Sequence, residues 1–372
     1  MGTAVEEQRL TAEDQLLILM QAAAYLTTRE MGSPEARICY ERAEFLCHSL
    51  GSPLLLYVAL IGQWRYSFMA DKLSTAMRIA ERVYSLAQEQ DDPRLMIGAY
   101  HALTATLYNR GDFECARQHA MRGLQIWRSG AVRSPVEEVS TPGVICLVYS
   151  ALTDWHLGEI AFCQATIAEA ISRANELNDM YASATALFWA AVLAYCERNP
   201  AKVERYASDL SELSTRQNFA FWLAGASILR GWACTVSGAT AEGVSRIEDG
   251  IDDWRVTGGI LGVPLFLALK AEALHLAHRT SEALEAIKEA EALVERSEDR
   301  WWCAELHRLR GVFLAALGAE ESKIEAAFCT AIRIAKEQKS ISLEKRAEAT
   351  DAEYRRQKAS GSGGGRFRLP LC

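Results

Sequence analysis

A pattern of small residues that returns about every 40 residues constrains this chain more than any other feature. Eight times, three mostly small or aliphatic residues occur at the spacing i, i+4, i+7, and their first members are 40, 40, 47, 40, 40, 40 and 41 residues apart. Residues with this spacing share one face of an α-helix, so each trio predicts a helix that packs closely on a neighbour. The trios are Ala36-Tyr40-Ala43, Ala76-Ala80-Val83, Ala116-Ala120-Gly123, Cys163-Ile167-Ala170, Val203-Ala207-Leu210, Gly243-Ile247-Gly250, Ala283-Ile287-Ala290 and Ile324-Phe328-Ala331.

Each trio follows a more apolar segment and a short turn, as residues 95–108 and Gly111 show for the third one. This order predicts a pair of helices per repeat, similar to a tetratricopeptide unit but about six residues longer than the usual 34. One pair cannot bury its apolar face alone, so neighbouring pairs must stack. We therefore expect an all-α fold: a right-handed α-solenoid of about eight tetratricopeptide-like helix pairs with a C-terminal capping helix.

The repeat also predicts the organisation of the chain. The one long interval contains a seven-residue insertion within 129–143, which is either a tolerated surface insertion or a functional or hinge loop. The expected parts are a polar leader (1–12), a solenoid (13–341), a charged capping helix (342–358) and a flexible tail (359–372). The expected solenoid units lie near 13–52, 53–92, 93–142, 143–179, 180–218, 219–259, 260–299 and 300–341.

Charge and composition exclude several classes of function. A net charge of −8 and a pI near 5.6 disfavour a general binder of nucleic acid or of anionic membranes, both of which need a basic face. The acidic, polar start is not a secretory leader, and no apolar run reaches the ~18 residues that span a bilayer. The ten cysteines include no C-x-x-C pair, which favours free thiols in a reducing cytoplasm.

From Gly258 onward the sequence resembles a known class of bacterial proteins. The run GGILGVPLFLALKAEALHLAHRTSEALEAIKEAEALVERSEDRWWCAELHRLRGVFLAALG, followed by IEAAFCTAIRIAKEQKSISLEKRA, carries the resemblance. It is similar to the C-terminal tetratricopeptide region of multidomain regulators that join an adenylate or guanylate cyclase domain to a signal-transduction ATPase. The resemblance is specific for about 219–347 and only general before it. It implies the sensor or scaffold half of such a regulator, as a fragment or as a free-standing relative.

No catalytic motif accompanies this resemblance. The chain has no Gly-Lys dipeptide, so a Walker A phosphate loop is excluded, and it has no H-E-x-x-H, G-x-S-x-G or G-x-G-x-x-G motif. Glu305 and Arg308, at i and i+3, favour an ion pair over an anion site. Trp301 and Trp302 favour core packing over an aromatic binding shelf. We expect neither enzymatic activity nor a cofactor or metal.

A tetratricopeptide array presents the first helix of each pair on its concave face. Positions 15, 11, 8 and 7 residues before each trio should therefore line a groove, with one extra residue of offset in the last unit. The groove would bind a protein or peptide partner, giving a non-catalytic scaffold. The alternative is the small-molecule-sensing regulatory half of a cyclase/ATPase signalling protein. The candidate binding residues are Arg65, His101, Tyr108, Asn109, Trp155, His156, Tyr195, Trp232, His275 and Arg308.

Overall fold

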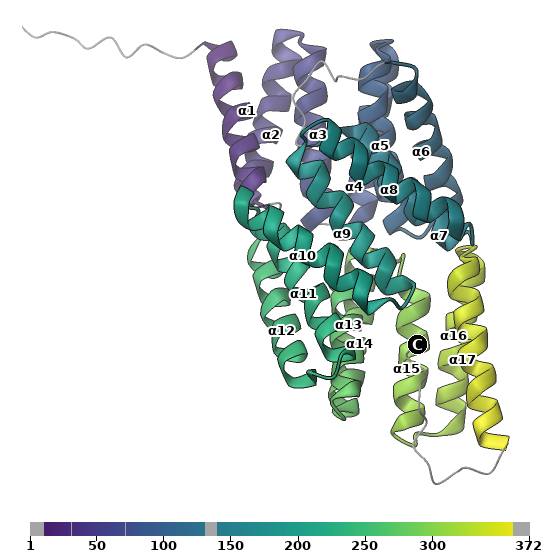
Figure 1. Ribbon diagram of the computed structural model, residues 1–372. Helices are drawn as coiled ribbons and strands as arrows, with labels where there is room; N and C mark the ends of the chain where they lie inside the picture. Colours follow the sequence, from purple (N-terminus) through teal and green to yellow (C-terminus); the bar gives the residue numbers. More distant parts are fainter. Residues whose placement is uncertain (1–10, 31, 71, 131–139, 360–372) are drawn as a thin grey trace, which may run out of the picture.

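The structure, a computed structural model, describes residues 11–30, 32–70, 72–130 and 140–359. Over these residues the chain forms helices and no strand, which confirms the all-α solenoid (Figure 1). The insertion residues 131–139 and most of the expected leader and tail lie outside the described residues. The helices are α1 (Ala12–Arg29), α2 (Pro34–Leu50), α3 (Pro53–Ala70), α4 (Leu73–Glu89), α5 (Pro93–Asn109), α6 (Phe113–Arg128), α7 (Pro142–His156), α8 (Ile160–Glu176), α9 (Met180–Cys196), α10 (Pro200–Gln217), α11 (Ala220–Val236), α12 (Thr240–Val256), α13 (Val263–Leu276), α14 (Thr280–Ser297), α15 (Cys303–Ala316), α16 (Glu321–Glu337) and α17 (Ile341–Ala359).

The helices alternate between two layers. The odd-numbered helices from α1 to α15, here called inner helices, are the first of each pair, and the even-numbered ones from α2 to α16 are the outer helices. All eight trios lie on outer helices, and every trio residue is buried. These residues are buried because the two helices of a pair lie close together. A Cβ added at Gly250 of α12, for example, would lie 2.7 Å from Ile228 Cγ1 of α11. Small residues thus let each outer helix dock on its partner.

Proline marks where the helices begin. Proline has no N–H to leave unpaired, and its fixed φ suits the first turn of a helix. Six of the eight prolines stand at such a position, and no described helix contains a proline beyond its first turn. The six are Pro34, Pro53, Pro93, Pro142, Pro200 and Pro264.

The solenoid coils until it contacts itself five units further along. The end of an inner helix accepts hydrogen bonds from the loop that precedes the inner helix five units later. Met69 O, in α3, accepts from Ile260 N (2.8 Å) before α13, and Asn109 O, at the end of α5, accepts from Arg300 N (2.7 Å) before α15. The end of α7 continues the series, because Trp155 O accepts from Ser342 Oγ in α17. Backbone groups at these helix ends, which would otherwise be orphaned, are satisfied in this way.

A second line of contacts joins the same two turns of the superhelix. Ser74 N, at the start of α4, donates to Glu298 Oε2 (2.7 Å) after α14, and Lys339 pairs with Glu114 one unit further on. Figure 1 shows the two turns, α1–α6 above and α11–α17 below, with α8–α10 crossing between them. Both lines of contacts close the centre of the superhelix along the inner-helix ends. None of the described helices is long and apolar enough to cross a membrane.

Candidate functional site

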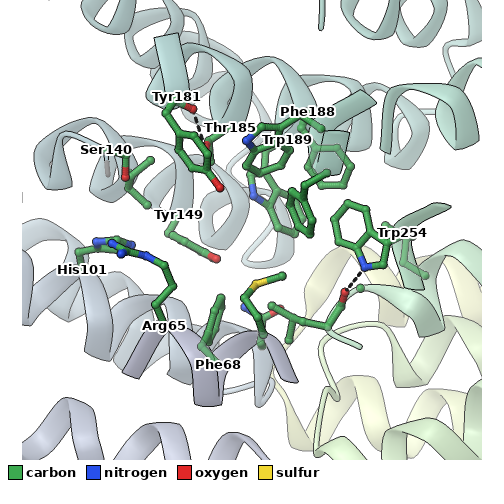
Figure 2. Close-up of a pocket in the computed structure, with 18 of the residues that line it drawn as sticks. Arg65, Phe68, His101, Ser140, Tyr149, Tyr181, Thr185, Phe188, Trp189 and Trp254 are labelled. Atoms are coloured by element: carbon green, nitrogen blue, oxygen red, sulfur yellow. Dashed lines mark hydrogen bonds between the residues drawn. The ribbon is translucent and has the colours of Figure 1, made fainter. Parts of the chain in front are cut away.

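A cavity remains open at the centre of the superhelix. It contains about 800 Å³ of space, its open mouth included, and inner helices from six consecutive units contribute to its wall (Figure 2). We call it the central pocket. The space inside it that the centre of a water molecule can reach is about 100 Å³, a size similar to that of cavities that hold one benzene-sized group. It is lined by Trp64, Arg65, Phe68, Met69, His101, Asn109, Ser140, Ile145, Tyr149, Tyr181, Thr185, Phe188, Trp189, Phe221, Trp222, Trp254, Leu261, Gly262, Leu265, Phe266 and Trp301.

One end of the central pocket is an aromatic wall. The ring of Trp254 packs on Phe221 at a centroid distance of 3.8 Å and edge-on against Phe266 at 4.7 Å. Phe188 lies 5.4 Å from Trp222 and extends the wall toward α9. Rings that contact one another on several sides are held in place, so the wall is a preformed apolar surface.

The other end of the pocket is polar and carries one cation. Arg65 of α3 is only 8% exposed and extends toward His101, at the opposite end of the pocket from Trp254 (Figure 2). Among the described residues, Arg65 forms no ion pair, and its guanidinium has no hydrogen-bond acceptor within bonding distance. No described Asp or Glu lines the pocket. Ser140 adds a hydroxyl group on this side, and Thr185 adds another nearer the middle of the pocket (Figure 2).

His101 does not add a second charge. Its ring packs edge-on against Trp64 at 5.1 Å. Burial, and then the nearby Arg65 guanidinium, lower the pKa of His101 to about 3. The imidazole is therefore neutral at physiological pH, and Arg65 is the sole charged side chain of the pocket wall among the described residues.

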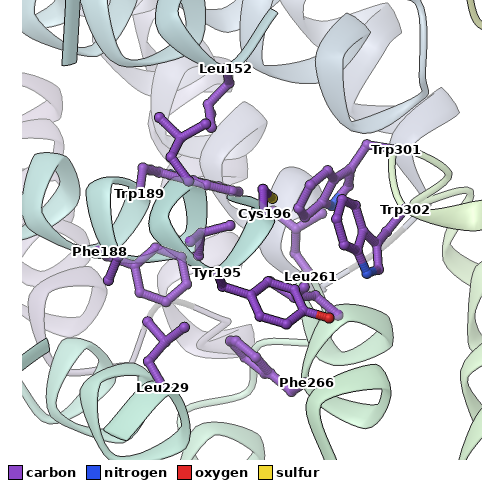
Figure 3. Packing of buried hydrophobic residues seen from close by; sticks show 14 of the residues in the cluster. Leu152, Phe188, Trp189, Tyr195, Cys196, Leu229, Leu261, Phe266, Trp301 and Trp302 are labelled. Carbon is purple, nitrogen blue, oxygen red and sulfur yellow. The ribbon is translucent and has the colours of Figure 1, made fainter. Parts of the chain in front are cut away.

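A dense aromatic core lies directly beside the central pocket. The imidazole of His156 stacks on Phe113 at 3.7 Å, and its Nδ1 lies 2.8 Å from Ser340 Oγ, on the next turn of the superhelix. Tyr108 is fully buried against Trp301, with ring centroids 5.4 Å apart. Figure 3 shows the continuation of this core through Trp189, Tyr195, Trp301 and Trp302.

Next to this core, two buried carboxylates hold the second superhelical turn together. Glu272 accepts hydrogen bonds from Tyr195 Oη (2.8 Å), Trp232 Nε1 (3.1 Å) and Arg198 (2.6 Å). Burial alone would raise the pKa of Glu272, but the Arg198 guanidinium holds it below its ordinary value. Glu305 is the second carboxylate and contacts Arg198 (2.9 Å) as well as guanidinium groups on α15 and α17. The network is internally paired and belongs to the core rather than to a site.

The structure divides the ten candidate binding residues into two groups. Arg65, His101 and Asn109 line the central pocket. The others lie outside it: His275 is half-buried at the end of α13 and contacts Thr280, and Arg308 is buried in an ion pair with Glu305. Tyr108, Trp155, His156, Tyr195 and Trp232 are buried in the aromatic core or the carboxylate network, so they do not line an open groove.

The position of a residue along its helix does not separate the two groups. Arg65 and His101, at offsets 11 and 15, face the cavity, and so does Asn109 at offset 7, whereas Trp232 at offset 11 is buried in the carboxylate network. Which residues face the cavity depends on how successive superhelical turns stack, and the offset from a trio does not record this. The expected pairing of Glu305 with Arg308 is confirmed at 2.7 Å, and Trp301 and Trp302 are buried as expected.

Sequence reasoning missed most of the aromatic wall. Trp254 lies on the outer helix α12, so a search of inner helices could not find it. Trp222 and Tyr181 lie in the first turns of α11 and α9, about 21 residues before their trios, which is further than the offsets of 15, 11, 8 and 7 residues that predict the groove. The repeated aromatic at that offset was the available signal. Across the described residues, no group of His, Cys, Asp and Glu side chains could hold a metal ion.

Several solved structures are similar to this fold. A Rap protein complexed with competence and sporulation factor superposes with a TM-score of 0.58 at 11% identity, covering 93% of this chain and all of that one. NprR in complex with its cognate peptide NprX gives 0.55 at 11% identity, covering 92% and 97%. The Rap conjugation gene regulator of plasmid pLS20, in complex with the Phr* peptide, gives 0.51 at 8%, covering 92% and 96%. At these identities the likeness shows the fold, a tetratricopeptide-like α-solenoid.

Comparison with related sequences does not assign the chain to a family. No family model matches the chain. An uncharacterized protein of Rhizobium meliloti (strain 1021) is 25% identical over 271 residues, which is 72% of this chain and 26% of that protein. The chain thus spans about a quarter of the length of the curated relative that it matches.

Proposed function

We propose that this chain is a non-catalytic receptor module that binds a segment of a protein or peptide partner in the central pocket. The observation that carries the proposal is the preformed aromatic cavity to which inner helices of six units contribute. An apolar side chain that enters such a wall loses its water and contacts rings on several sides, as the anchor residues of peptide interfaces do. The peptide complexes of the structurally similar Rap and NprR proteins support the same use of this fold.

We further propose that binding regulates a larger signalling protein. The Rhizobium meliloti relative is much longer than the matched region, which supports a role as one part of a multidomain regulator. The resemblance to the repeat region of cyclase/ATPase regulators points the same way. In such a protein the occupied pocket would bridge the inner helices of six units and so stiffen the superhelix relative to its empty state.

A cavity that holds one ring-sized group also suits the second candidate, a sensor for a small molecule. The two candidates differ in what the mouth of the pocket must admit. A peptide continues outside the cavity, and its affinity depends on residues on both sides of the anchor. A small molecule is enclosed, and its affinity depends on the pocket alone.

The test fills the pocket and asks whether peptide binding is lost. Thr185 and Thr215 are matched positions: each hydroxyl donates to the carbonyl four residues earlier, but Thr185 faces the pocket, whereas Thr215 is exposed on α10. Peptides selected from a random phage-displayed library on the wild-type chain would be measured by fluorescence anisotropy. We expect Thr185→Trp to weaken binding at least about tenfold and Thr215→Trp to leave it unchanged. Equal affinity for all three proteins would contradict the proposal.

A further inference from the structure

Arg65 is the one feature of the central pocket that the aromatic wall does not explain. A guanidinium carries five N–H donors and keeps its charge at any physiological pH. Burying that charge without a partner costs free energy, so buried arginines are normally paired. The chain follows this rule elsewhere: Arg308, which is buried to a similar extent, forms two hydrogen bonds with Glu305 (2.7 and 2.8 Å). Arg65 has no such partner among the described residues.

The residues that line the pocket with Arg65 supply no negative charge. The other polar groups of this lining are neutral, among them His101, whose pKa is lowered by burial and by Arg65, and the hydroxyls of Ser140 and Thr185. Its charge also acts on Tyr181 across the pocket, where it partly offsets the rise that burial causes in the pKa of the phenol. A guanidinium in a poorly hydrated site attracts carboxylate strongly and can hold it through two parallel hydrogen bonds.

The pocket is therefore amphipathic along its length, with rings at the Trp254 end and a cation at the Arg65 end. We infer that the ligand group accepted by the central pocket is an aromatic or aliphatic body that carries one anionic group, and that Arg65 binds this group. The inference rests on the proposed function, because it specifies the ligand of the same pocket. A peptide supplies this chemistry with an apolar residue next to a carboxylate, and a small aromatic acid supplies it in one molecule.

The first experiment uses two fluorescent probes that differ by one anionic group. 8-Anilinonaphthalene-1-sulfonate carries a sulfonate, and N-phenyl-1-naphthylamine has a closely similar ring system without it. Energy transfer from the pocket tryptophans, such as Trp222 and Trp254, reports occupancy of this pocket. We expect Arg65→Met to weaken the sulfonate probe at least about tenfold and to leave the neutral probe unchanged. Arg65→Lys should retain most of the affinity.

The control is Arg78→Met, which removes the same charge from an exposed position on α4, where Arg78 has no ion pair among the described residues. It should change neither affinity. The Arg65→Met variant loses an unpaired buried charge, so its melting midpoint should be equal to or higher than that of wild type. Equal loss of both probes, or a lower melting midpoint with unchanged sulfonate affinity, would overturn the inference.

A second arm separates the two sources of the anion. The selected peptides would be compared with forms whose carboxylates are amidated, and indole-3-acetate with indole-3-acetamide, each on wild type and Arg65→Met. Preference for the acid that disappears in Arg65→Met supports the inference for that source. Peptides that bind in a Thr185-dependent way without such a preference would overturn the inference and keep the proposed function. An Arg65-dependent preference for indole-3-acetate with no peptide binding would keep the inference and reject the proposed function.

Discussion

At the scale of single residues, burial decides which polar groups belong to the core and which are available for a ligand. Glu305 and Arg308 are as buried as any apolar side chain, but each satisfies the other. Their spacing in the sequence was enough to predict the pair. The unpaired state of Arg65 could not be predicted, because it depends on which carboxylates the coiling of the whole chain brings near α3.

Asp299 is a second unusual buried group, beside the pocket residue Gly262. Its carboxylate is 1% exposed; Oδ2 accepts the Gly262 N–H (3.0 Å), while Oδ1 has no hydrogen-bond partner in the described part of the chain. Burial raises the pKa of Asp299 from 3.8 to about 7, although the Gly262 N–H lowers it in part. The folded protein therefore holds a proton on Asp299 between about pH 4 and 7 that the unfolded chain has lost.

The sign of the resulting pH dependence follows from this difference. The contribution of Asp299 to stability is fully present below pH 3.8 and is lost as the pH rises to about 7, at about 1.4 kcal/mol per pH unit. Asp299→Asn removes this titration and retains a carbonyl for Gly262. Relative to wild type, the free energy of unfolding of the variant should thus be about 2–3 kcal/mol higher at pH 8 than at pH 5, which means a relatively more stable variant at pH 8. Urea titrations at the two pH values measure it.

The exposed Asp249 gives the control, because Asp249→Asn should show no such difference between the two pH values. If Asp299→Asn and wild type differ by the same amount at pH 5 and pH 8, Asp299 is not protonated in the folded protein, and its buried position is compensated in another way.

At the scale of the elements, the 40-residue repeat was nearly sufficient to predict the helix pairs and their buried faces. The trios predicted which face of each outer helix is buried, and this is confirmed. This worked because the contact inside a pair is local and recurs eight times with the same geometry. What the repeat did not show was which inner-helix residues face the central pocket and which face the aromatic core, because this depends on how successive superhelical turns stack.

Gly250 tests the packing of a pair. Its missing Cβ would lie 2.7 Å from Ile228 Cγ1 and 3.2 Å from Ala224 O, so any larger side chain must push α12 away from α11. Gly250→Leu should destabilise the protein by more than the ~1–3 kcal/mol typical of an overpacked core. Asp249 is exposed on the same helix, so the control variant Asp249→Leu should leave the stability nearly unchanged. Equal melting midpoints for the two variants would mean that Gly250 does not hold the helices together.

At the scale of the whole molecule, the superhelix closes on itself after five units, and this closure creates both the core and the pocket. The hydrogen bonds from Ile260 to Met69 and from Arg300 to Asn109 join successive turns at the inner-helix ends, and the central pocket remains open beside them. The sequence could not predict it. The number of units per superhelical turn depends on small rotations between neighbouring pairs, and no local pattern in a 40-residue repeat records their sum.

The closure makes a clear prediction for where a partner binds. A selected peptide that carries a photoreactive diazirine beside its apolar anchor would be cross-linked to the full chain, and the attachment sites mapped by mass spectrometry. The account predicts attachment to pocket residues of the inner helices, such as Phe68, Tyr181 and Trp222, and loss of these products in Thr185→Trp. Attachment to exposed apolar residues of outer helices, such as Phe45 or Phe162, at equal yield in wild type and Thr185→Trp, would contradict it.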